Sequence, residues 1–386
     1  MVNKKIAIIV GAVVLVISAV VSYLIFSGQS SFMANPTSSY KPPTASGSTT
    51  AQNNEPKTEE CPINGALLTK TQKSLWEKRR PMGVMMENHK EARPQSGFSN
   101  ADVIYEAVAE GGITRMLSVF YCQDAPMIGP IRSARIYYLK FLQGYGDHPL
   151  YAHVGGANAA GPADALGEIS DLGWNNYNDL NQFAVPFPYY WRDYDRLPGS
   201  ATEHTVYSTT SKLWDFAAKK RGLTNVNEKG QKWDVGFVPW KFRDEAKPAD
   251  RGTTAKIDFS FWTQFASDYN VTWNYDKISN TYLRVNGGQP HIDKNTGKQL
   301  STKNVIIVFA DESAVNDEHG SDHLFYKIIG TGDGLVFQDG NATKMTWKKK
   351  DEETSMKFYE ASGKEISIVR GQVWVEVLPI GNKATY

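Results

Sequence analysis

Two arginines in the segment GPIRSAR (residues 129–135) raise the first chemical question. Arg132 and Arg135 lie three residues apart, and the apolar pattern that follows predicts a helix with Ser133 as its N-cap. The first turn of a helix exposes unpaired N–H groups and carries partial positive charge, so two guanidinium groups there are unfavourable on their own. An anion among them would explain the arrangement. We therefore predict an anion site here, occupied either by a ligand or by a carboxylate of the protein.

Other arginines could belong to the same site. Arg115, Arg192 and Arg196 lie in predicted turns or at strand ends. A guanidinium group binds phosphate or carboxylate through paired hydrogen bonds, so these side chains could converge on an anionic ligand with the two arginines of GPIRSAR. The alternative is internal pairing with acids of the protein, namely Asp102, Glu106, Glu110 and Asp193.

Three of these acids are predicted to share one side of their segment. Asp102, Glu106 and Glu110 are spaced by four residues, which places them on one side in a strand and in a helix alike. In a hairpin through the Gly-Gly pair that follows, Arg115 would lie opposite Val108 and diagonal to the last two acids. The carboxylates could hold Mg²⁺ together with ligand phosphates, or one of them could be a general base.

Three further features carry weaker signals. His153 precedes a Gly-Gly turn that could hold an anion, although a hydrogen-bonded structural histidine is the alternative. The aromatic, proline-containing loop 183–207 could stack on a sugar ring or pack onto its own domain. The segment DEHGSDH (317–323) is interpreted as a solvated loop rather than a metal site. Because the chain has no phosphate-loop, zinc-protease or nucleophile-elbow motif, we expect no metal and no cofactor.

The N-terminus and the charge balance bear on location. The 386 residues contain 42 Lys and Arg against 41 Asp and Glu, a net charge of +1, which argues against bulk binding of nucleic acid. Lys4 and Lys5 precede an uncharged apolar run, Ile6 to Phe26, long enough to cross a bilayer. The positive-inside rule then predicts a cytoplasmic tip and single-pass anchor over residues 1–26, with the body outside the membrane. A cleaved signal peptide is the alternative.

The rest of the chain divides into a linker and two folded parts. Residues 27–60 are rich in Ser, Thr and Pro and are predicted to be a disordered linker. Patterning predicts an α+β protein, with a mixed α/β domain over 61–223 and a connector followed by a β-rich antiparallel domain over 224–386. The later strands would form a curved sheet or small barrel. Outside the membrane, Cys61 and Cys122 could form a disulfide, or they could be two buried free thiols.

Several long motifs carry a family resemblance. The segments RPMGVMMENHKEARPQSGFSNADVIYEAVAEGGITRMLSVFY, IGPIRSAR, HVGG, WRDYDR and WKKKDEETSMKFYEASGKEISIVRGQVWVEVLP resemble the YerB-type bacterial lipoproteins. The resemblance covers about residues 75 to 380. It implies a two-part domain of unknown function on the outer side of the bacterial cytoplasmic membrane, and it implies no reaction.

The chain departs from that family pattern in two places. Many members carry a lipidation cysteine directly after the apolar segment, whereas here the first cysteine is Cys61, so a transmembrane anchor would replace the lipid. The family reads Pro-His-Asn where this chain has Glu203-His204-Thr205, which puts a role for that trio in doubt. In layout alone, the acidic segment, the arginine turn and the Gly-Gly turn are similar to the LytR-CpsA-Psr phosphotransferases.

The sequence therefore favours a membrane-anchored envelope protein that binds an anionic envelope ligand, such as a glycan or phospholipid, or a protein partner. The alternative is an Mg²⁺-dependent enzyme acting on a phosphate-bearing cell-wall precursor. The oligomeric state is not predicted. The candidate ligand-binding residues are Asp102, Glu106, Glu110, Arg115, Arg132, Arg135, His153, Arg192 and Arg196.

Overall fold

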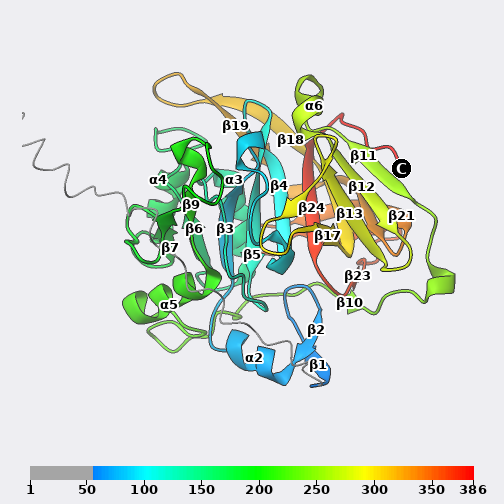
Figure 1. The fold of residues 1–386 in the computed structure, drawn as a ribbon, viewed down its shortest axis with the longest axis horizontal. Helices are drawn as coiled ribbons and strands as arrows, with labels where there is room; N and C mark the ends of the chain where they lie inside the picture. The colour runs from blue at the N-terminus through cyan, green and yellow to red at the C-terminus, as the bar shows by residue number, and fades with distance from the viewer. Residues whose placement is uncertain (1–54) are drawn as a thin grey trace, which may run out of the picture. The chain divides into compact units, whose positions relative to one another are not determined.

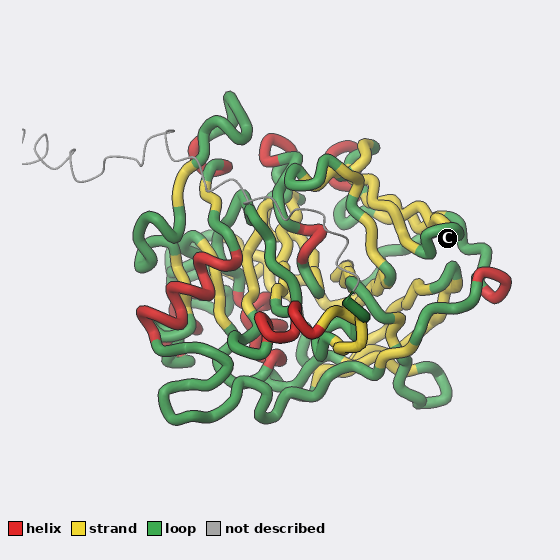
Figure 2. Tube along the Cα trace, turned by 60° about the horizontal axis from the view of Figure 1, so that its bottom comes forward, coloured by secondary structure: helices red, strands yellow, loops and turns green. Residues whose placement is uncertain are grey.

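The computed structural model describes residues 55–386, and the strands dominate it (Figures 1 and 2). The prediction of an α+β protein with a mostly antiparallel C-terminal part is confirmed. Among residues 55–386, no helix has the length and apolar character needed to cross a bilayer. The predicted anchor over residues 1–26 lies outside the described residues.

An 11-stranded sheet runs through the centre of the molecule (Figure 1). Its strand order is β22-β21-β20-β18-β24-β4-β5-β3-β6-β7, and β19 pairs with β18 beside this path. The strands from the first half of the chain are β3 (Met82–Glu87), β4 (Val103–Glu110), β5 (Ile113–Phe120), β6 (Leu150–His153) and β7 (Asp179–Asn181). Those from the second half are β18 (Asn304–Asn316), β19 (Asp322–Lys327), β20 (Gly330–Gln338), β21 (Asn341–Lys349), β22 (Lys357–Tyr359) and β24 (Val373–Pro379).

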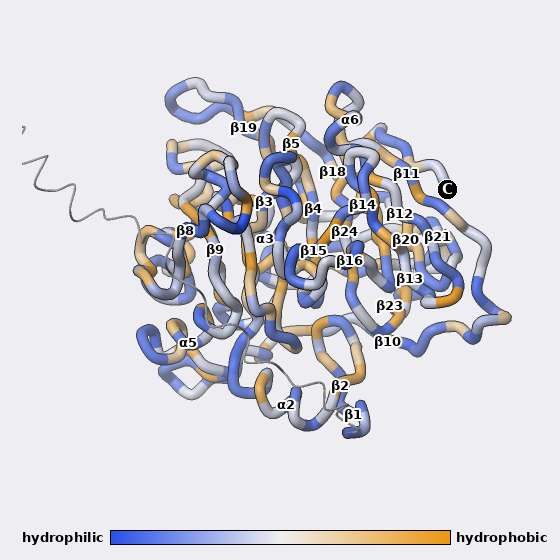
Figure 3. The backbone as a smooth tube through the Cα atoms, viewed as in Figure 1, coloured by the Kyte–Doolittle hydropathy of each residue, from blue (hydrophilic) through white to orange (hydrophobic). Residues whose placement is uncertain are grey.

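Six of the C-terminal strands therefore belong to the same sheet as the N-terminal strands rather than to a barrel of their own. Strand β24 pairs in parallel with β4 on one side and with β18 on the other, so the sheet continues across the predicted boundary at residues 223 and 224. Strands β4 and β24 are apolar and buried for most of their length, as strands covered on both faces are, whereas β18 is buried only in its first half, up to Ala310 (Figure 3). Periodicity alone could not show which distant strands pair.

A second, five-stranded sheet comes from the C-terminal half alone. Its members are β11 (Lys256–Phe259), β12 (Val271–Asp276), β13 (Thr281–Asn286), β14 (Gln289–Pro290) and β17 (Ser301–Thr302). Short two-stranded pairs complete the strand set: β1 (Lys57–Glu60) with β2 (Leu67–Thr69), β8 (Trp191–Arg192) with β9 (Val206–Tyr207), β10 (Phe242–Arg243) with β23 (Ile368–Val369), and β15 (Ile292–Asp293) with β16 (Lys298–Gln299).

The helices are short and lie around the strands (Figure 2). They are α2 (Lys70–Trp76), α3 (Ile136–Leu142), α4 (Ala165–Asp171), α5 (Thr210–Arg221) and α6 (Ala266–Tyr269). Helix α5 has Thr209 as its N-cap and Gly222 as its left-handed C-cap.

The predicted linker over residues 27–60 is wrong at its end. Lys57–Glu60 forms β1, which pairs with β2. Glu60 forms an ion pair with Arg370. Cys61 follows the strand directly and forms a disulfide with Cys122. These tertiary contacts order a segment whose composition alone favours disorder. The remainder of the predicted linker up to residue 54 lies outside the described residues.

A buried ion network joins the two sheets. Arg284 on β13 donates from Nη2 to Glu106 Oε2 on β4 (2.6 Å) and from Nη1 to Glu376 Oε1 on β24 (2.7 Å), and all three side chains are fully buried. The indole N–H groups of Trp273 and Trp374 donate to the same two carboxylates at 3.0 and 3.2 Å. The guanidinium group also lies 4.4 Å from the centre of the Trp374 ring, within cation–π range.

The network holds two carboxyl groups and one guanidinium group, so full ionisation would leave a buried negative charge. Burial, followed by the neighbouring Glu106, raises the pKa of Glu376 to about 8, although Arg284 and Trp273 oppose the shift. Glu376 is therefore protonated in the folded protein at neutral pH, and the network is electrically neutral.

This proton makes stability depend on pH. Between the ordinary glutamate pKa of 4.5 and about 8, the folded protein holds a proton at Glu376 that the unfolded chain has lost. The free energy of unfolding should therefore fall, by a few kcal/mol at most, as pH rises through this window. Glu376→Gln should remove this part of the slope between pH 5 and pH 8 in urea unfolding, whereas the exposed control Glu353→Gln should keep it. An unchanged slope in Glu376→Gln would contradict the protonated state.

Candidate functional site

The β4–β5 hairpin carries the first part of the candidate site. Its turn is Gly111-Gly112, with φ of +55° and +75°, values that glycine adopts without strain. The register departs from the predicted one, because a bulge between Val108 and Glu110 shifts the pairing and Arg115 lies opposite Ala107. The bulge also breaks the alternation along β4, so Glu110 reaches Arg115 while Glu106 points into the core network.

Arg115 and Arg135 share the single carboxylate of Glu110. Arg115 Nη2 lies 2.7 Å from Glu110 Oε1, and Arg135 Nη2 lies 2.5 Å from Oε2. Backbone carbonyls hold the two guanidinium groups in place, Ser133 O for Arg115 (3.1 Å) and Ala134 O for Arg135 (2.9 Å). We call Glu110, Arg115 and Arg135 the arginine cluster.

Burial differs sharply within the arginine cluster. The side chains of Arg115 and Arg135 are 3% and 9% exposed, whereas that of Glu110 is 53% exposed. Burial opposes ionisation of Glu110, but the charges of Arg115, Arg135 and Arg132 together lower the pKa of Glu110. Burial and then the charge of Arg115 lower the pKa of Arg135. The cluster thus keeps one positive charge in excess, and solvent reaches it through its carboxylate.

The two arginines of GPIRSAR do not lie in the first turn of a helix, so that part of the prediction is wrong. The segment continues as extended backbone, since Arg132 N donates to Met85 O and Ala134 N donates to Gly155 O. Helix α3 begins at Ile136, and its N-cap is Arg135 rather than Ser133. Both arginines are paired with carboxylates of the protein, and neither lies within the first turn of the helix.

Arg132 pairs with a second buried acid. Its Nε lies 3.1 Å from Glu87 Oε1 at the end of β3, and Glu87 Oε2 lies 2.8 Å from Nδ1 of His204. The side chains of Glu87 and His204 are 4% and 5% exposed. Nothing in the sequence pattern points to this pair, because Glu87 and His204 lie more than a hundred residues apart.

His153 occupies a separate, closed environment. Its Nε2 lies 2.6 Å from Asp179 Oδ1, and its Nδ1 lies 2.7 Å from Gly155 O. The ring is fully buried, and both nitrogens already face acceptors. This geometry favours the structural interpretation of His153 over anion binding.

Arg192 and Arg196 do not join the arginine cluster through any contact among the described residues. Arg192 donates to Thr202 O (2.6 Å), and Arg196 donates to Ser96 Oγ and Asn295 Oδ1, both at 2.8 Å. The bonds of Arg196 fasten the aromatic loop 183–207 to Ser96 and Asn295, whereas the bond of Arg192 to Thr202 lies within the loop.

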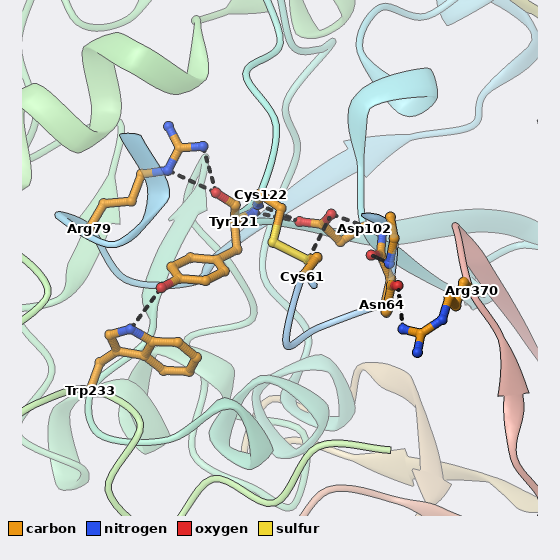
Figure 4. Close-up of a disulfide and its surroundings, with 10 residues drawn as sticks. Cys61, Asn64, Arg79, Asp102, Tyr121, Cys122, Trp233 and Arg370 are labelled. Atoms are coloured by element: carbon orange, nitrogen blue, oxygen red, sulfur yellow. Dashed lines mark hydrogen bonds between the residues drawn. A yellow bond between two sulfur atoms is a disulfide. The ribbon is translucent and has the colours of Figure 1, made fainter. Parts of the chain in front are cut away.

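The three acids do not form a common site. Asp102 precedes β4 and accepts hydrogen bonds from the backbone N–H groups of Tyr121 (2.7 Å) and Cys122 (2.9 Å) and from Asn64 (Figure 4). Burial raises the pKa of Asp102 to about 6, against the effect of these two N–H groups. Glu106 belongs to the buried ion network around Arg284, and Glu110 is the only one of the three acids in the arginine cluster. The prediction that these three carboxylates share one side is therefore wrong. The bulge turns Glu106 and Glu110 to different sides, and four residues of strand span about 13 Å, which keeps the groups apart.

Asp102 instead supports the disulfide region. The bond between Cys61 and Cys122 closes a loop between positions 61 residues apart, and Asp102 lies beside it (Figure 4). Arg79 donates to Tyr121 O nearby, and Tyr121 accepts a hydrogen bond from Trp233 (3.1 Å). The disulfide thus ties the segment after β1 to the end of β5.

Comparison with known proteins gives the family. The N-terminal domain model of "Protein of unknown function (DUF3048)" matches residues 68–224, and its C-terminal domain model matches residues 261–375. The chain is 30% identical over 322 residues to "Putative lipoprotein YerB" of Bacillus subtilis (strain 168), covering 83% of this chain and 86% of the relative. The chain belongs to this DUF3048 family, as the resemblance to YerB-type proteins predicted.

A solved structure agrees with this assignment. The crystal structure of the YerB protein from Bacillus subtilis superposes with a TM-score of 0.67 at 27% identity, covering 85% of this chain and all of that one. Both the arginine cluster and the Glu87–His204 pair lie within the part matched by the N-terminal model.

The arginine cluster predicts the effect of removing its carboxylate. Glu110→Gln leaves two buried guanidinium groups facing each other without an anion, so it should destabilise the protein, by about 1–2 kcal/mol after allowance for the exposure of Glu110. Thermal unfolding at low ionic strength should show the loss, and added sulfate should restore much of it in the variant while stabilising the wild type less, because Glu110 competes with sulfate there. Equal sulfate responses in the two proteins would contradict the unpaired-cation explanation.

Proposed function

We propose that this protein works on the outer side of the bacterial cytoplasmic membrane and binds a phosphate-bearing envelope ligand at the arginine cluster. The observation that carries the proposal is the ratio of charges: two buried guanidinium groups share one half-exposed carboxylate. A phosphate group carries about 1.5 to 2 negative charges near neutral pH and offers three acceptor oxygens. Such a dianion would offset both guanidinium groups, which the single charge of Glu110 cannot do.

The geometry supports a binding mode in which a phosphate group replaces the Glu110 carboxylate at the two guanidinium groups. Arg115 and Arg135 are held by backbone carbonyls as well as by Glu110, so their positions do not depend on that carboxylate alone. The exposed Glu110 side chain can turn toward water while a phosphate takes its place. Preorganised donors lose little conformational entropy on binding, which favours a charged ligand of this size.

Three observations support the location. A disulfide persists in oxidising surroundings such as the outer face of the bacterial membrane. The YerB relative is named as a lipoprotein, a class attached to membranes. The apolar run Ile6 to Phe26 offers this chain a different attachment, a single-pass anchor with a cytoplasmic N-terminus. The alternative of an Mg²⁺-dependent enzyme stays a prediction from sequence.

Calorimetric titration with inorganic pyrophosphate tests the binding proposal. The wild type should bind one equivalent, and Arg115→Gln/Arg135→Gln should lose at least tenfold in affinity. Glu110→Gln should gain several-fold, since it removes the competing carboxylate. Arg370→Gln is a suitable control, because Arg370 lies between two acids, Glu60 and Asp244, and has no cationic excess.

The sign of the Glu110→Gln effect separates this proposal from a purely structural role. A structural role predicts no pyrophosphate binding by the wild type or equal binding in all four proteins, and either result would overturn the proposal. Vesicles containing anionic phospholipid, compared with free pyrophosphate, then distinguish a lipid headgroup from a soluble phosphate.

A further inference from the structure

A second cluster of chemically active side chains lies beside Arg132 and is separate from the arginine cluster. It contains His89, Glu91 and His204. We propose that these three residues form a binding site for a divalent transition-metal ion, with Zn²⁺ as the best match. The proposal does not rest on the phosphate-binding function.

Two short turns bring the residues together. His89 is the N-cap of the 3-10 turn Lys90–Ala92 directly after β3, and Glu91 lies within that turn. His204 ends the 3-10 turn Thr202–His204, just before β9. The imidazole rings of His89 and His204 are stacked, with centroids 4.9 Å apart and planes 7° apart. Each of the three residues offers one ligand atom, and these atoms lie within 4.8 Å of one another.

Glu87 sets the orientation of His204. If the Nδ1–H of His204 donates to the buried carboxylate at 2.8 Å, Nε2 carries a lone pair, and it faces Glu91 Oε2 at 3.7 Å. Two acceptors facing each other require a proton or a cation between them. A carboxylate behind a histidine is also the usual outer partner of a metal-bound imidazole, because it fixes the tautomer and strengthens the ligand.

The spacing fits a small ion once the Glu91 side chain shifts and the His89 ring turns, because the in-plane lone pairs of two stacked rings are parallel and do not point at one ion. Ligand atoms around a tetrahedral zinc ion, each at about 2.0–2.1 Å, lie about 3.4 Å apart. The distance between His204 and Glu91 is already close to this value. The Glu91 side chain is 56% exposed and can shift, whereas His204 is buried and held by Glu87. His89 Nδ1 accepts a long bond of 3.3 Å from Glu91 N, which is easily given up.

Charge and ligand type support the same assignment. Glu87, Glu91 and the neighbouring Glu203 bring three negative charges, and Arg132 offsets only one of them at Glu87. A divalent ion would neutralise the two remaining negative charges. Two imidazoles and one carboxylate are a common zinc ligand set and leave a fourth position for water. The sequence alone predicts no metal here, because the ligands fall in two segments more than a hundred residues apart, and neither segment alone has metal-type spacing.

Titration of the tag-free, chelator-treated full chain with Zn²⁺ against a competing chromophoric chelator tests the site. The wild type should bind one equivalent. His89→Gln and Glu91→Gln should each weaken binding at least tenfold, and both positions are exposed enough to leave folding intact. His319→Gln, which changes a 72%-exposed histidine paired with Glu318, is the matched control and should bind as the wild type does.

Cobalt gives a second readout that folding alone would not change. Co²⁺ at a low-coordinate nitrogen and oxygen site absorbs visible light, and this absorption should appear with the wild type and disappear with Glu91→Gln. The proposal is overturned if the wild type binds no stoichiometric Zn²⁺, or if the two variants bind as tightly as it does. It is also overturned if His204 is doubly protonated near neutral pH and its NMR signals do not respond to Zn²⁺.

Discussion

One buried guanidinium group joins the two halves of this protein. Arg284 reaches from the C-terminal sheet to Glu106 on β4 and Glu376 on β24, and no part of the three side chains touches solvent. Burying three ionisable groups is costly unless each is paired and hydrogen-bonded. Here the two indoles add a hydrogen bond to each carboxyl group, and among the described residues only Glu376 Oε2 of the two carboxyl groups is left without a partner. Because β4 lies beside β24 in the central sheet, the network also fixes the strand that carries Glu110 to the surface.

The protein uses two opposite charge ratios at two positions along β4, Glu106 in the middle of the strand and Glu110 at its end. In the core, one arginine serves two carboxyl groups, and a proton on Glu376 restores neutrality. At the hairpin, two arginines serve one carboxylate, and no proton can remove the excess positive charge, since arginine stays protonated in proteins. The first arrangement is closed and structural. The second is open through Glu110, so its excess charge is available to an anion from solution. The bulge between Val108 and Glu110 separates the two environments.

The sequence could predict what depends on local pattern. The hairpin through Gly111-Gly112 and the helix after GPIRSAR, which is α3, are confirmed because glycine turns and apolar periodicity determine them. The motifs also identified the family. The grouping of Arg115, Arg135 and Glu110 was among the predicted combinations, although the reason given for it, a helix start, is wrong.

What depends on long-range pairing could not be predicted. A one-residue bulge has no sequence signature here, yet it moved Arg115 by one position in the register and split Glu106 from Glu110. Arg284 and Glu376 belong to strands that looked ordinary, and only the parallel pairing of β24 with β4 brings them to Glu106. Likewise, His204 reaches Glu87 only once the loop before β9 packs over the end of β3.

The central claim is that the described residues fold as one cooperative unit around Arg284. Native-state hydrogen exchange of the full chain in increasing urea measures it most directly, by comparing amides of β5 with amides of β20. These strands come from different halves of the chain, and both are interior strands of the central sheet. Their opening free energies should be equal and should fall in parallel with urea. If the β20 amides open at a clearly lower free energy while those of β5 stay protected, the halves unfold independently and the claim is contradicted.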